Sequence, residues 1–210
     1  MPISTYDLPF SPACERNQAP IAAELARLLP RPGEGCCRVL EIGSGTGQHA
    51  VYFQQNLPWL HWQASDVPGN LPDLKARFAL EGQGNLAYPL PLQLGHDDWP
   101  DARFDAVFTA NTLHIMPFEL APELFSGAAS VLGSGGLLLV YGPFSEAGQH
   151  SADSNRAFDL SLRARDPSMG IRDLQSLRSM AQSAGFEQVD TIAMPANNQL
   201  LHFKKNNGTP

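Results

Sequence analysis

The chain has 210 residues, of which 43% are apolar and 17% are charged, and its formal net charge at pH 7 is −7. This length and apolar content are typical of one globular domain with a substantial core. The 14 Lys and Arg residues are scattered, which argues against nucleic acid or an anionic membrane as a partner, since phosphate neutralisation needs clustered basic side chains. We therefore expect a small-molecule substrate; the composition does not predict an oligomeric state.

Neither a signal peptide nor an apolar run of membrane-spanning length is apparent, so we expect a cytoplasmic protein. The three cysteines, Cys14, Cys36 and Cys37, lack the spacing of metal ligands. His96, Asp97 and Asp98 are consecutive, and three successive residues rarely converge on one ion. We predict no metal site.

The first expected element is a helix over residues 21–29, preceded by a polar arm. The helix is indicated by amphipathic spacing, with Pro20 suited to its first turn, and its apolar positions are Ile21, Leu25, Leu28 and Leu29. Two readings stay open for residues 11–17: a lid across a ligand site, or a solvated arm.

Residues 38–49, R-V-L-E-I-G-S-G-T-G-Q-H, are the most informative stretch. Its apolar start predicts a short buried strand, within which Glu41 needs a polar partner. Glycines then alternate with other residues, which permits positive φ and close approach of a ligand; they are Gly43, Gly45 and Gly47. A helix is expected over 48–57. A strand, a glycine turn and a helix N-terminus are typical of a ligand cradle with exposed N–H groups.

The spacing of these glycines selects among ligands. A dinucleotide fingerprint, G-x-G-x-x-G, would need glycine at position 48, where Gln48 stands. The observed E-x-G-x-G-x-G resembles the first motif of the class I S-adenosylmethionine (SAM) methyltransferases. The resemblance implies that the loop lies against the methionine part of SAM, with Glu41 ordering a loop that comprises Gly43, Ser44, Gly45 and Gly47. An ordinary α/β turn is the alternative.

A second acidic residue supports a nucleoside cofactor. The strand expected over 61–66 ends in Asp66, about 20 residues beyond the glycines, where a ribose-binding carboxylate is expected. Alternatively, Asp66 begins the turn that continues through Pro68 and Gly69.

The next elements are a helix over 71–80 and a proline-interrupted strand over 86–94, which the prolines assign to a sheet edge. In methyltransferases the residues after this strand commonly contact adenine, and the resemblance thereby implies His96. Gly95 stands where an aspartate is expected, which weakens the assignment.

The segment 104–111 predicts a central strand ending in Asn111, and ligands bind outside the carboxyl ends of such strands. Asn111 offers a donor and an acceptor to a cofactor or substrate. His114, with an unperturbed pKa near ~6.5, is a candidate general base. Local capping or packing is the alternative role of His114.

The remaining elements complete an α/β pattern. We expect a helix over 118–132 that is closed by the glycine-rich residues 133–136, and then a buried strand over 137–141 that ends in the candidate pocket residue Tyr141. The later elements are a polar-then-helical segment over 151–159, a helix over 174–184, and an antiparallel hairpin of 186–194 with 199–203. Strands that alternate with helices predict a doubly wound sheet. By analogy with class I methyltransferases, we expect a Rossmann-like fold with a seven-stranded, mostly parallel sheet of order 3-2-1-4-5-7-6.

We predict one domain over 1–210, with an arm and helix to 33, a core over 34–205 and a disordered tail over 206–210. Six segments together are similar to the family that includes methyltransferase-like protein 26, a class I SAM-dependent methyltransferase-like family of the DUF938 type. They are S-P-A-C-E-R-N (11–17), L-E-I-G-S-G-T-G-Q-H-A (40–50), N-T-L-H-I (111–115), Y-G-P-F (141–144), D-S-N-R-A-F-D (153–159) and M-P-A-N-N (194–198). The resemblance implies SAM as cofactor and names no substrate.

The main hypothesis is therefore a SAM-dependent methyltransferase that acts on a small molecule. Arg16 and Asn17 are candidate lid contacts, since Arg16 is able to pair the cofactor carboxylate bidentately. His114 and Tyr141 are the candidate catalytic residues. The alternative is a non-catalytic SAM-binding or scaffold protein with the same fold. Gln48 disfavours a nicotinamide oxidoreductase.

Overall fold

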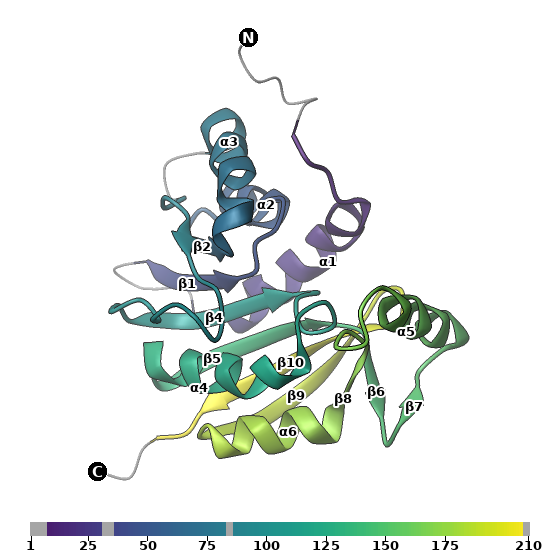
Figure 1. The fold of residues 1–210 in the computed structure, drawn as a ribbon. Coiled ribbons are helices and arrows are strands. Elements are labelled where there is room, and N and C mark those ends of the chain that lie inside the picture. The colour runs from purple at the N-terminus through teal and green to yellow at the C-terminus, as the bar shows by residue number, and fades with distance from the viewer. Residues whose placement is uncertain (1–7, 31–35, 83–85, 208–210) are drawn as a thin grey trace. The chain divides into compact units, whose positions relative to one another are not determined.

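The computed structural model describes residues 8–30, 36–82 and 86–207. Figure 1 shows the order of helices and strands along the chain. The chain divides into two compact units: unit 1 extends to Asp98 and includes Phe104–Ala106, and unit 2 comprises Trp99–Arg103 and the chain from Val107. We describe each unit by itself, and the single domain expected from the sequence stays a prediction.

The central sheet has seven strands in the order β3-β2-β1-β4-β5-β10-β9. Strand β4 (Phe104–Ala110) contributes residues to both units. When three short strands of a second sheet are left out of the numbering, this is the order 3-2-1-4-5-7-6 of the class I methyltransferase fold. The predicted fold class is confirmed.

Unit 1 contains the parallel part of the sheet, in which β1 pairs with β2 and β2 with β3. Helix α1 packs against α2, and α2 packs against β2. Its elements are α1 (Pro12–Leu28), β1 (Cys37–Ile42), α2 (Gln48–Asn56), β2 (Leu60–Asp66), a 3-10 turn η2 (Pro68–Asn70), α3 (Leu71–Glu81) and β3 (Leu90–Pro91).

Two expectations for unit 1 need correction. Helix α1 begins at Pro12 rather than at residue 21, because Ser11 caps it and Pro12, not Pro20, occupies the first turn. The strand expected over 86–94 forms a continuous ladder at Leu90–Pro91 and a single bridge between Leu86 and Trp62, since prolines remove ladder donors. Its predicted edge position is confirmed.

Unit 2 contains the antiparallel part of the sheet, where β10 pairs with both β5 and β9, as the predicted hairpin requires. Its elements are a 3-10 turn η3 (Phe118–Leu120), α4 (Ala121–Val131), β5 (Leu132–Gly142), β6 (Phe144–Glu146), β7 (Gln149–His150), α5 (Asp153–Arg165), β8 (Arg172–Asp173), α6 (Leu174–Ser183), β9 (Phe186–Met194) and β10 (Asn198–Lys205). Residues 133–136 lie in β5 and do not close the preceding helix, which ends where Leu132 becomes extended.

A second sheet of order β7-β6-β8 was not expected from the sequence. Its strands have two or three residues each, which is too short for an alternating pattern to be visible. Within the described residues, no helix is long and apolar enough to span a membrane. Residues 208–210 of the predicted tail lie outside the described residues, whereas the Asn206 N–H donates to the Gly185 carbonyl at 2.9 Å.

Candidate functional site

The glycine loop after β1 is attached to the end of β2 by backbone and side-chain hydrogen bonds. The N–H groups of Gly43 and Ser44 both donate to the Ser65 carbonyl at 3.0 Å. In return, the Ser65 N–H donates to Ser44 Oγ at 3.2 Å and Ser65 Oγ donates to the Glu41 carbonyl at 2.6 Å. The parallel register that places Ile42 beside Ser65 makes these contacts possible.

Glu41 is buried beneath this loop with the polar partners that its position requires. Its Oε2 accepts hydrogen bonds from Ser44 Oγ at 2.7 Å and from Trp62 Nε1 at 2.9 Å. The pKa of Glu41 is raised to about 7, mainly by burial and to a smaller extent by the nearby Asp66 carboxylate, while the two hydrogen bonds lower it. Glu41 thus fixes one end of the loop through Ser44.

Glycine is needed at the three loop positions for different structural reasons. All adopt positive φ, 72° at Gly43, 55° at Gly45 and 75° at Gly47, where other residues are strained. A Cβ on Gly47 would lie 2.6 Å from Leu74 Cδ1, so this position is also needed for packing against α3. A Cβ on Gly45 would meet nothing within 4 Å. Gly45 therefore borders open space.

Asp66, the candidate ribose ligand, is buried and already bonded to its own chain. Its Oδ2 accepts from the Gly45 N–H, and its Oδ1 accepts from the Val67 N–H at 2.7 Å and from Asn70 Nδ2 at 2.9 Å. A carboxylate offers about four lone pairs, so Oδ2 has capacity for one further donor. The ribose role stays a prediction, and Asp66 also has the turn-forming role that was its alternative.

The sequence suggested that the N–H groups of the loop are exposed, but they donate hydrogen bonds within the chain. The Gly47 N–H donates to the Ser44 carbonyl at 2.9 Å, and the N–H groups of Gly43, Ser44 and Gly45 donate to the end of β2 as described. The expected cradle of exposed N–H groups is therefore wrong for these four residues. What the loop leaves unfilled is the space beside Gly45.

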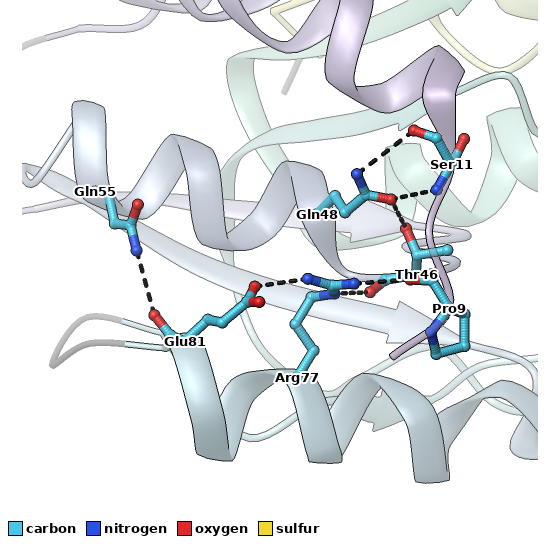
Figure 2. Close-up of polar contacts among 7 residues, drawn as sticks. All are labelled: Pro9, Ser11, Thr46, Gln48, Gln55, Arg77 and Glu81. Atoms are coloured by element: carbon cyan, nitrogen blue, oxygen red, sulfur yellow. Dashed lines mark hydrogen bonds and ion pairs between the residues drawn. The ribbon is translucent and has the colours of Figure 1, made fainter. Parts of the chain in front are cut away.

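Gln48, the residue that replaces a third glycine, binds the N-terminal arm. Its Oε1 accepts from the Ser11 N–H at 2.6 Å and from Thr46 Oγ1 at 2.9 Å, and its Nε2 donates to the Ser11 carbonyl at 3.4 Å. Figure 2 shows this side chain between the arm and the loop. Gln48 is a functional candidate in its own right, beyond its use in excluding a dinucleotide.

Arg77 on α3 is a site residue that sequence reasoning missed. Its guanidinium donates to the Thr46 carbonyl (Nε, 2.6 Å), to the Pro9 carbonyl (Nη2, 2.7 Å) and to Glu81 (Nη1, 2.6 Å), as Figure 2 shows. A signal was present, since Arg77 follows Leu74 by three residues on the buried face of an amphipathic helix.

The other candidates in unit 1 lie on α1 and after β3. Asn17 is buried, with its Oδ1 2.7 Å from His49 Nε2, and burial lowers the pKa of His49 to about 4. Arg16 is exposed. His96 has a 74% exposed side chain that pairs with Asp97 at 2.8 Å, and Gly95 stands before it because φ there is 79°. Cofactor contacts by Arg16, Asn17 and His96 stay predictions.

Unit 2 holds Asn111, which directly follows β4 and has a left-handed conformation with φ 62°. Its N–H donates to the Tyr141 carbonyl at 2.9 Å. Asn tolerates this backbone region better than most residues. The left-handed backbone therefore explains why asparagine suits position 111, and the proposed ligand contact of Asn111 stays a prediction. Tyr141 itself is buried in β5.

His114 lies in the same unit, 6% exposed, with its ring edge-on to that of Phe158 at 5.2 Å between centroids. Burial, and secondarily the positive charge of Arg172, lowers the pKa of His114 to about 4. Arg172 donates to the carbonyls of Leu113 at 2.8 Å and Met116 at 2.6 Å and so holds the loop that carries His114. At neutral pH the imidazole is uncharged and able to accept a proton.

The fold of this chain is shared with SAM-dependent methyltransferases. It resembles the apo structure of SibL, a SAM-dependent methyltransferase (TM-score 0.75, 20% identity, 92% of this chain and 56% of that one). It also resembles an O-methyltransferase family protein from Burkholderia thailandensis (0.76, 18%, 94% and 58%). A third is human N-acetylserotonin methyltransferase in complex with SAM (0.75, 17%, 92% and 53%).

These comparisons define the class I methyltransferase fold, and the chain spans a little more than half the length of the solved structures that it matches. Residues 8–205 match the family described as "Protein of unknown function (DUF938)", and the chain belongs to that family. The more specific likeness to methyltransferase-like protein 26 stays a prediction.

Proposed function

We propose that the protein is a SAM-dependent methyltransferase that acts on a small-molecule acceptor. The observation that carries the proposal is the glycine loop, whose positive-φ residues are attached to the end of β2 and leave open space at Gly45. The shared fold supports it, because the neighbours are described as SAM-dependent or O-methyltransferases.

The residues of unit 1 fit such a cofactor. The backbone from Gly43 to Gly47 would lie along the methionine portion, and Asp66 Oδ2 has the capacity to accept one ribose hydroxyl. When bound, SAM supplies an electrophilic methyl group on a sulfonium. The chain's residues then need only to hold, orient and shield the reactants, since methyl transfer is an in-line displacement in which positioning supplies much of the rate.

In unit 2, His114 is our candidate for accepting a proton from the acceptor. Because its pKa is lowered to about 4, the ring is neutral above pH 5, and it is a weaker base than a histidine with an ordinary pKa. Tyr141, buried in β5, is the weaker candidate, with a role in shaping the pocket.

One observation favours the second candidate function, a non-catalytic protein that keeps the fold as a scaffold. Four loop N–H groups and three lone pairs of Asp66 are satisfied within the chain itself. A loop that is complete without a ligand does not require one for its stability.

Methyl transfer from methyl-labelled SAM to a panel of small hydroxyl and amine acceptors tests the choice. We expect transfer by the wild type and at least a hundredfold loss in Gly45→Val, which fills the open face and strains φ. Gly133→Val is the matched control, because Gly133 also faces open space but has no positive φ. Binding of SAM with no transfer to any acceptor would favour the scaffold, and equal transfer by Gly45→Val would contradict our placement of the cofactor.

A further inference from the structure

Residues Leu8–Ser11, which we call the strap, precede α1 and contact the glycine loop through two side chains. We propose that Gln48 and Arg77 are positioning residues that couple the strap to the glycine loop, so that both become ordered together when the cofactor site is filled. The coupling is a property of unit 1 alone, and its link to a ligand rests on the proposed function.

Each of the two residues contacts both partners. Gln48 pairs with the N–H and the carbonyl of Ser11 and also accepts the Thr46 hydroxyl. Arg77 donates to the Pro9 carbonyl and to the Thr46 carbonyl. Thr46 is therefore held on both its side chain and its backbone by the residues that hold the strap (Figure 2).

Thr46 lies at the centre of the candidate cofactor loop. It follows Gly45, which faces open space, and precedes Gly47, which packs against Leu74. A ligand that fixes the conformation of Gly45 also restricts Thr46, since the two share a peptide bond. The restriction passes to the strap through Gln48 and Arg77.

The strap depends on these polar contacts more than on apolar burial. Leu8 is buried, but Phe10 is 58% exposed. Arg77 is 6% exposed, and its charge is balanced by Glu81, so its hydrogen bonds to the two carbonyls are charge-assisted and shielded from water. When either Gln48 or Arg77 is lost, the strap keeps the other residue, the buried Leu8 and the hydrogen bonds by which Ser11 caps α1.

Gln48 and Arg77, the two residues that anchor the strap, also border an empty space. A hollow of about 280 Å³ lies beside them, lined by Gln18, Gln48, Val51, Tyr52, Gln55, Arg77 and Glu81. Gln48 and Arg77 therefore have unfilled space on one side, whereas Leu8 of the strap is buried. Because coupling free energies are reciprocal, a strap that stabilises the filled loop is itself stabilised by the ligand.

Amide hydrogen exchange tests the coupling without a ligand. The reporters are the Ser11 N–H, bound to Gln48, and the Gly47 N–H, bound within the loop. In Gln48→Leu and in Arg77→Met we expect both amides to exchange about tenfold faster, the effect of one typical hydrogen bond. Gln55→Leu is the matched control, because Gln55 lines the same hollow and bonds to Glu81 but to neither strap nor loop. Faster exchange at Ser11 with an unchanged Gly47 would overturn the proposal.

Two further measurements keep the result unambiguous. Thr46→Val replaces only the hydroxyl by a methyl group, and it should accelerate exchange of both amides by a smaller factor. This variant substitutes for any other that fails to fold. Unchanged exchange of the Ser11 and Gly47 amides in Thr46→Val would count against the coupling. Adding S-adenosylhomocysteine, the demethylated product, to the wild type should slow Ser11 as well as Gly47. Protection of Gly47 alone would contradict the coupling, whereas failure of the product to bind would contradict only the proposed function.

Discussion

Asp66 illustrates how one side chain serves both the fold and a proposed ligand. Its carboxylate joins the glycine loop, through the Gly45 N–H, to the turn after β2, through Val67 and Asn70. Removing it therefore disturbs the loop whether or not ribose binds. A test of its ribose role has to separate these two effects.

We predict that Asp66→Ala weakens binding of S-adenosylhomocysteine at least tenfold. A ribose contact is specifically revealed by the difference in affinity between two ligands, measured by calorimetry. Wild type should bind the product more tightly than its 2′,3′-dideoxy analogue, whereas Asp66→Ala should bind both with equal affinity. Asn70→Ala, which removes one partner of Asp66 but no acceptor for ribose, should keep the preference. An unchanged affinity in Asp66→Ala would show that the ribose assignment is wrong.

Glu41 gives a prediction about pH. Its pKa is raised from 4.5 to about 7, so it contributes stability that is fully present below pH 4.5 and is lost as the pH rises through 7. Glu41→Gln retains an acceptor for Ser44 and Trp62 without a charge. The free energy of unfolding of Glu41→Gln minus that of wild type should therefore increase between pH 5 and pH 8.

Urea unfolding of both proteins across this range measures the difference directly. The buried His49 and His114, with pKa values lowered to about 4, act with the opposite sign: their stabilisation is present above pH 6.5 and is lost as the pH falls. They are common to both proteins and cancel in the difference. A difference that does not change with pH would mean that Glu41 is already ionised or already neutral throughout.

At the scale of elements, helix α4 depends on one glycine. A Cβ on Gly127 would lie 1.8 Å from Trp99 Cε2, so the helix backbone packs directly on the indole. Gly→Ala in a helix interior normally stabilises by ~1 kcal/mol, but overpacking costs ~1–3 kcal/mol and this contact is severe. We expect Gly127→Ala to lower the free energy of unfolding by about 2 kcal/mol in urea titrations, whereas Gly133→Ala, with open space around it, should be near neutral. A Gly127→Ala protein of wild-type stability would show that α4 does not rest on Trp99.

The elements differ in how well the sequence predicted them. The glycine loop, α2 and the terminal hairpin have local signals, namely alternating glycines, a helix-breaking Leu57-Pro58 and two apolar runs, and all were predicted. The predicted start of α1 was wrong because Pro12 and Pro20 each suit the first turn of a helix. Only the cap at Ser11 decides between them. The strands β6, β7 and β8 carry too few residues for a pattern.

The residues of the candidate site also differ in how well the sequence predicted them. Glu41, the glycines and Asp66 could be singled out from the sequence because their spacing along the chain is fixed by β1 and β2. The structure joins them by hydrogen bonds, and their cofactor contacts stay predictions. Arg77 was missed because its partners are chosen through space: Pro9 is 68 residues away and Thr46 is 31. Neither the exposure of His96 nor the left-handed backbone of Asn111 could be read from residue type alone.

At the scale of the whole molecule, the fold and the family are established, and the activity is our proposal. The methyltransferase fold brings a glycine loop and an acidic residue together at the ends of β1 and β2, where ligands of open α/β sheets bind. The family match covers residues 8–205. Gln48 and Arg77 attach the strap to that loop.

Calorimetric titration of the wild-type protein with SAM and with S-adenosylhomocysteine tests the central claim most directly. Our account predicts that both bind with micromolar affinity, because the glycine loop and Asp66 contact parts that the two molecules share. Absence of binding by either would contradict the proposed cofactor site and leave the shared fold as a scaffold.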